Sequence, residues 1–237
     1  MPDYEYFEVK ETDSAYTIFK GTGLSPWASR ELIESGNFDT IKRLNKLYFK
    51  KPKYKKNYIA YPITAEERNE TQYTPLAPLK DGDILVTFST HTLSWRHGHL
   101  GLVTDAQNGI ILEHMAIGQT SCFGRAKRWG NYPAFAVLRH PEEKVAKAAA
   151  EYAKDNLLDI SYNILAGVFK KDKSHMEKID CSHCSHIVWQ AYKAVGADID
   201  RDGGILVTPK DVALCKDLKV VQIFGFDTKD YEDRLLK

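Results

Sequence analysis

The segment DCSHCSHIVWQAY, residues 180–192, gathers thiol, imidazole and hydroxyl side chains within seven positions before the sequence becomes apolar. Three chemistries are compatible with it. Cys181, His183, Cys184 and His186 offer the thiolates and imidazoles that zinc prefers, but no second pair of ligands follows at the usual spacing. A redox C-x-x-C pair is typical of a βαβ context, which the flanking sequence lacks. The third chemistry is that of one nucleophilic cysteine.

Helix-start signals distinguish the two cysteines. Ser182 suits the N-cap of a helix, so Cys184 is expected in the first turn, where free backbone N–H groups and the helix dipole favour a thiolate. Cys181 precedes the cap, so these N–H groups and the helix dipole do not stabilise its thiolate. The following apolar positions have the spacing of a buried helix face: Ile187, Val188, Ala191 and Val195. An ordinary, semi-buried role for both cysteines is the alternative.

A thiolate nucleophile requires a base and a group that orients the base. His99 begins the alternating run HLGLV, and Gly101 on the same strand face is expected to leave room for a cysteine from another element. Glu113 stands in the apolar run ILEHM, where a carboxylate needs a hydrogen bond, for instance from an imidazole. Exposure at a sheet edge is the alternative for Glu113. His97 is expected in an exposed turn, and His114 on the opposite strand face.

The motifs GDILVTFS, HGHLGLV, GIILEHM, DISYNIL, CSHCSHIVWQAY and VTPKDV, in this order, resemble those of the permuted papain-like NlpC/P60 cysteine hydrolases, the YiiX and YycO-like group. In that group the histidine strand precedes the cysteine helix. The resemblance covers residues 79–224 and leaves residues 1–75 without a counterpart. It implies an α+β fold of the circularly permuted papain-like (NlpC/P60) type. Such a fold has an antiparallel sheet packed against helices, here with a partly helical N-terminal extension.

The resemblance assigns a role to each member of a Cys-His-Glu triad. Cys184 matches the nucleophile, because the family pattern C-S-x-[LV]-[VI]-[WY] aligns from it and not from Cys181. His99 of H-L-G-L-V matches the general base. Glu113 matches the acidic group that orients this base, although His114 replaces the family's alanine.

Other positions carry weaker expectations. Tyr162 matches the tyrosine of the family's Tyr-Asp segment, with Asn163 in place of aspartate. Tyr162, His97 and Ser185 are candidate substrate contacts or oxyanion donors. His186 stands where many members carry Glu or Gly, which affects the expected substrate preference. Neither a metal nor a cofactor is expected.

The implied activity is that of a cysteine peptidase or amidase. The triad would cleave an amide through a thioester acyl-enzyme, with the backbone N–H of Cys184 as one oxyanion donor. The resemblance implies peptidoglycan stem peptides, γ-glutamyl or N-acyl amino-acid linkages as substrates. Acyl transfer or thioester hydrolysis on lipids is one alternative. A non-catalytic wall- or ligand-binding module of the same fold is another.

Composition excludes several other classes of protein. The chain has 237 residues, 43% of them hydrophobic, which predicts a globular protein. Its net charge of +1 is too small to give the overall positive potential that attracts nucleic acid. No apolar run is long enough to predict a transmembrane helix, and the polar start is unlike a secretory signal. We therefore expect a cytoplasmic protein, or a cell-wall protein if a leader has been removed. Four cysteines are too few for a disulfide-built fold.

Residues 1–75 are expected to form an extension that covers part of the cleft, and residues 76–237 the catalytic domain. In the extension, SPWASRELIESG predicts a capped helix. The basic stretch 41–56 is expected to pack its aromatic residues against the catalytic domain, with its lysines facing solvent. The further predicted elements are strands 81–89, 97–105, 109–117, 134–140 and 218–224, and helices 141–157 and 184–196.

Overall fold

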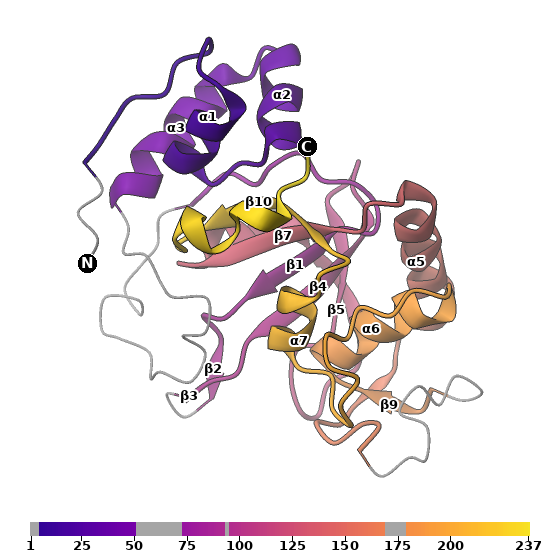
Figure 1. Ribbon diagram of the computed structural model, residues 1–237. Coiled ribbons are helices and arrows are strands. Elements are labelled where there is room, and N and C mark those ends of the chain that lie inside the picture. Colours follow the sequence, from indigo (N-terminus) through magenta and orange to yellow (C-terminus); the bar gives the residue numbers. More distant parts are fainter. Residues whose placement is uncertain (1–4, 51–72, 93–94, 169–178) are drawn as a thin grey trace.

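A six-stranded antiparallel sheet with helices on both faces forms the centre of the protein, which confirms the expected α+β class (Figure 1). The structure is a computed structural model and describes residues 5–50, 73–92, 95–168 and 179–237. The strand order is β10-β7-β1-β4-β5-β6. The strands are β1 Ile84–Thr87, β4 His99–Asp105, β5 Ile110–Glu113, β6 Cys122–Arg125, β7 Phe135–Arg139 and β10 Lys219–Phe224. Two short pairs accompany this sheet: β2 His91–Thr92 with β3 Trp95–Arg96, and β8 Ser161–Tyr162 with β9 Cys181–Ser182.

The sheet separates two hydrophobic cores, because side chains alternate between the faces of each strand. Leu100 and Leu102 of β4 belong to the core beneath α5, α6 and α7, whereas Val103 belongs to the core beneath α1, α2 and α3. In Figure 1 the indigo helices α1–α3 lie on one side of β10, and α5–α7 lie on the other. The helix bounds are α1 Ala15–Thr22, α2 Pro26–Glu34, α3 Phe38–Lys50, α5 Glu143–Asn156, α6 Cys184–Ala194 and α7 Pro209–Leu214.

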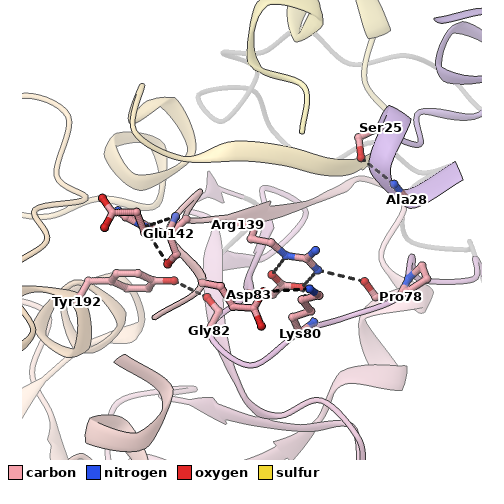
Figure 2. Close-up of polar contacts among 11 residues, drawn as sticks. Ser25, Ala28, Pro78, Lys80, Gly82, Asp83, Arg139, Glu142 and Tyr192 are labelled. Atoms are coloured by element: carbon pink, nitrogen blue, oxygen red, sulfur yellow. Dashed lines mark hydrogen bonds and ion pairs between the residues drawn. The ribbon is translucent and has the colours of Figure 1, made fainter. Parts of the chain in front are cut away.

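The helices of the N-terminal extension share a continuous core with the sheet. Ile41 and Leu44 of α3 are fully buried in the same cluster as Leu85 of β1. The predicted capped helix is present as α2, in which the Ser25 hydroxyl accepts a hydrogen bond from the Ala28 N–H (Figure 2). Residues 51–56 of the basic stretch lie outside the described residues. Within the described part of the chain, no helix has both the length and the apolarity to span a bilayer.

Two elements differ from their predicted form. The predicted strand 109–117 ends at Glu113, so His114 lies in the following loop and not on the opposite strand face. There the His114 ring is buried and packs edge-on against the ring of Tyr162, at 4.9 Å between centroids. The helix that begins at Cys184 is capped by His183 and not by Ser182. Ser182 instead belongs to β9, whose pairing with β8 gives it extended backbone.

A buried ion pair lies beneath the extension, between β7 and the turn before β1 (Figure 2). The guanidinium of Arg139 donates two hydrogen bonds to the Asp83 carboxylate, at 2.6 and 2.7 Å. The Trp27 ring of α2 covers this guanidinium, 3.9 Å from its central carbon. Burial raises the pKa of Asp83, and the hydrogen bonds from Arg139 oppose that rise. The pair therefore ties α2 to the sheet through an interaction that excludes water.

Replacing Arg139 with alanine is expected to lower the free energy of unfolding by about 3–5 kcal/mol, because it leaves a buried carboxylate without its partner. Equilibrium unfolding in urea measures this loss. Arg30→Ala on the exposed face of α2 is the matched control, expected to change stability by about 0.5 kcal/mol at most. Equal losses in the two variants would show that the ion pair is not a main stabilising contact.

Candidate active site

The candidate base and its carboxylate lie at one end of the β4–β5 pair. β4 begins at His99 and the antiparallel β5 ends at Glu113, which pairs with Gly101, so the two residues lie at the same end of the strand pair. The Nε2 atom of His99 lies 2.9 Å from Oε2 of Glu113. Both side chains are buried, with 5% and 1% of their surface exposed. A carboxylate at this position orients the imidazole and leaves Nδ1 available to the thiol.

The candidate nucleophile, Cys184, is the first residue of α6, which packs against α5 and β4. The preceding His183 caps the helix, because its Nδ1 accepts a hydrogen bond from the backbone N–H of His186 at 3.4 Å. Backbone N–H groups in a first helical turn have no partner within the helix. The thiol therefore lies where helix-terminal N–H groups stabilise negative charge.

The imidazoles control the charge of this thiol. Burial by itself raises the pKa of the Cys184 thiol, but hydrogen bonding with His183 and His99 outweighs burial and lowers the pKa to about 5. Burial by itself lowers the pKa of His99, but hydrogen bonding with Cys184 and Glu113 raises it to about 9. A thiolate paired with an imidazolium is thus the favoured state between these two values.

Two further residues, which sequence reasoning missed, surround the His99–Glu113 pair. The guanidinium of Arg128 donates a hydrogen bond to Oε2 of Glu113, the same oxygen that binds His99. The indole of Trp129 stacks on the His99 ring with 5.5 Å between centroids and 17° between planes. Both belong to the short helix η2 Ala126–Asn131. No apolar periodicity marks this segment, so only its three-dimensional position identifies these contacts.

Glycines make room for the acidic group. A Cβ at Gly101 would lie 3.0 Å from the indole of Trp129 and 3.3 Å from Cγ of Glu113. The expectation that Gly101 leaves space for the cysteine is therefore wrong, because Trp129 and Glu113 fill that space. A Cβ at Gly124 of β6 would overlap Oε1 of Glu113. The carboxylate can occupy its position only because residue 124 has no side chain.

Substituting Gly124 with alanine is expected to displace the Glu113 carboxylate and lower catalytic turnover by about 10²-fold, the usual cost of a 1 Å misplacement in a catalytic group. Steady-state kinetics on any substrate that the protein cleaves measures this loss. Gly204→Ala is a suitable control, because its Cβ would meet the exposed Asp202 carboxylate and, at 3.9 Å, the Leu206 carbonyl oxygen, with no group of the candidate triad nearby. Full activity in Gly124→Ala would show that the carboxylate position is unimportant.

The remaining predicted residues divide into two groups. Tyr162 pairs with Ser182 in the β8–β9 ladder, two residues before Cys184, and burial and the charge of Cys184 raise the pKa of Tyr162 to about 12. Ser185 is buried, and its hydroxyl donates to the Val207 carbonyl at 2.8 Å, which ties α6 to a neighbouring loop. His97 is exposed in the turn before β4, with Nδ1 2.9 Å from the carbonyl oxygen of Gly98. The structure thus brings Tyr162 to the candidate triad and gives Ser185 a packing role.

In the described part of the chain, the Cys-His cluster does not bring three ligand atoms within 4.8 Å of one another. Within the described residues, one group of acidic, histidine or cysteine side chains has three ligand atoms within 4.8 Å of one another, and it comprises Asp200, Asp202 and Asp211. Arg201 forms ion pairs with Asp202 and Asp211 in this group. All four cysteines are free thiols, so Cys181 and Cys184 are not joined in a disulfide.

Comparison with known proteins identified no relative of the chain. No family model, no curated protein and no solved structure matches the chain.

Proposed function

We propose that the protein is a cysteine hydrolase that cleaves amide bonds through a thioester acyl-enzyme, on a circularly permuted papain-like fold. The observation that carries this proposal is the convergence of a helix-start thiol, a buried imidazole and a buried carboxylate. Cys184 comes from α6, which is distant in the sequence from the β4–β5 pair that carries His99 and Glu113. The order of these elements along the chain, histidine strand before cysteine helix, matches the permuted NlpC/P60 group.

The proposed reaction begins when the Cys184 thiolate attacks the amide carbonyl carbon. The backbone N–H of Cys184 stabilises the oxyanion, and the Tyr162 hydroxyl is the proposed second donor. The His99 imidazolium then protonates the leaving amine as the thioester forms. Neutral His99 next takes a proton from water, which attacks the thioester, releases the acid and restores the Cys184 thiolate beside the His99 imidazolium. Glu113 holds the imidazole in one orientation throughout.

A substrate panel tests the proposal directly. The wild-type protein is incubated with a γ-glutamyl-diaminopimelate stem peptide and with N-acyl amino acids of short and long acyl chain. Released amine is measured, and intact-mass spectrometry detects the covalent acyl-enzyme on Cys184. Turnover with an acyl adduct supports a hydrolase. Binding without turnover or adduct on any member supports the non-catalytic module and overturns the proposal.

A second candidate function, hydrolysis or transfer of lipid acyl groups, is favoured by exposed apolar side chains on segments that follow the site residues in the sequence. They lie on three loops and one edge strand: Met115, Ile117, Phe123, Ile164, Leu165 and Ile205. Backbone hydrogen bonds join two of these segments to the site. The Asn163 N–H donates to the Ser182 carbonyl at 2.7 Å, and the Tyr162 N–H donates to the Gln119 carbonyl at 3.1 Å.

Large exposed apolar groups are rare in such a cluster unless the surface meets an apolar partner. Ile117 is 79% exposed and Ile205 is 71% exposed, which suits contact with an acyl chain. In the substrate panel, a strong preference for long over short acyl chains supports this second candidate. Equal rates, or a preference for the stem peptide, favour the first.

A further inference from the structure

A basic pocket lies beside the candidate triad, between the extension and the outer end of the sheet. It has a volume of about 730 Å³ and, among the described residues, is lined by Arg43, Tyr73, Arg125, Lys127, Arg128 and Asn131. Four of these side chains are cationic and none is acidic. Arg43 comes from α3, whereas Arg125 and Lys127 come from β6 and η2. The pocket therefore forms only when the extension is docked on the rest of the molecule.

Among the described residues, little negative charge compensates the positive charge of this pocket. Arg128 is paired with Glu113, but within the described residues no carboxylate forms an ion pair with Arg43, Arg125 or Lys127. Instead, the Arg43 guanidinium and the Lys127 ammonium share one aromatic ring. They lie 5.8 and 6.0 Å from the centroid of Tyr73. Cations gathered in this way repel one another unless an anion lies among them.

Close backbone packing holds the pocket in shape. The Thr74 N–H donates to the Gly130 carbonyl at 2.7 Å, which joins the end of the extension to η2. A Cβ at Gly130 would overlap the Thr74 carbonyl oxygen and the Tyr73 ring. The Arg43 guanidinium donates to the Tyr73 carbonyl at 3.2 Å, so its position is fixed as well. The cations are therefore presented by a preformed surface, which lowers the entropic cost of binding a ligand.

We propose that the basic pocket binds a small oxyanion, a phosphate ester or a polycarboxylate. Guanidinium groups match the planar, bidentate geometry of carboxylate and phosphate oxygens, and an ammonium adds a compact charge. The volume suits a small ligand and not a polymer. Arg128 links the pocket to the candidate active site, because its guanidinium also binds the Glu113 carboxylate. The anion is either a charged part of the substrate or a free ion that binds beside it.

Isothermal titration of the full-length protein with inorganic phosphate and with citrate at low ionic strength tests this site without requiring catalysis. Arg43→Gln/Lys127→Gln is expected to weaken binding by about ten-fold or more, because charge-assisted hydrogen bonds are lost. Lys46→Gln/Lys144→Gln removes the same charge from exposed positions on α3 and α5 and is expected to change affinity by less than about two-fold. No binding by the wild type, or equal weakening in both double variants, overturns the proposal.

A kinetic arm identifies the source of the anion. Competitive inhibition by phosphate, together with a raised KM and an unchanged kcat in Arg43→Gln/Lys127→Gln, assigns the pocket to a charged group of the substrate. If phosphate binds to the wild type but the KM of Arg43→Gln/Lys127→Gln is unchanged, the pocket is assigned to a free ion. Because titration reports on the pocket alone, absence of amide hydrolysis would refute the proposed function and leave the anion site standing.

Discussion

Replacing Cys184 with alanine is expected to lower kcat for amide hydrolysis by about 10⁴-fold or more, because no other group can form the thioester. Cys181→Ser is expected to retain activity within about three-fold. Cys181 lies on β9, before the helix cap, and therefore gains no first-turn stabilisation of a thiolate. Amine release from a cleaved substrate, measured under saturating conditions, gives both values.

Circular dichroism and thermal unfolding show whether each cysteine variant is folded before the rates are compared. The pair is a stringent test because the two thiols are separated by only two residues. Loss of activity in Cys181→Ser with activity retained in Cys184→Ala would move the reactive centre out of α6. That result would also break the alignment of the motif C-S-H-I-V-W with the permuted NlpC/P60 pattern.

Alkylation of Cys184 by iodoacetamide is expected to follow a pH profile with its midpoint near pH 5, because the pKa of the thiol is lowered to about 5. In His99→Gln the midpoint is expected to rise by about two pH units or more, since the imidazolium partner is lost. The labelling rate at pH 6 should then fall by about ten-fold or more. A Cys122→Ser/Cys181→Ser/Cys215→Ser background confines the signal to Cys184.

The same pair of groups is expected to determine the pH dependence of the proposed reaction. A group with a lowered pKa loses its charged form as the pH falls through that value, so activity should decline below about pH 5. A histidine with a raised pKa loses its proton as the pH rises, so activity should decline above about pH 9, where the leaving amine has no acid. A profile of kcat/KM with its acidic limb near pH 8 would show that the thiol is not activated.

Local sequence patterns identified the candidate triad. The sequence before Cys184 is polar, and the residues after it have apolar side chains at helical spacing. This change predicts a helix start, and α6 begins at Cys184 in the structure. Strand alternation after His99 and the apolar run around Glu113 mark two paired strands, and the hydrogen bond expected for the buried carboxylate is present. These inferences succeed because helix starts and strand alternation depend on neighbouring residues.

The contacts around the triad were decided by tertiary structure. Arg128 and Trp129 reach Glu113 and His99 from η2, a segment without apolar periodicity that follows a largely exposed edge strand. The role of Gly124 depends on which strand lies beside β5, and periodicity does not specify a partner. For the same reason Gly101 was interpreted wrongly.

Sequence by itself thus determined the candidate groups for the chemistry and the kinds of element on which they lie. Tertiary structure decided what surrounds them: Trp129 on the imidazole, Arg128 on the carboxylate, and the extension packed on the sheet. The physical reason is the range of the interactions. Residue spacing records which face of an element is buried, whereas the identity of the partner on that face depends on contacts between residues distant in sequence.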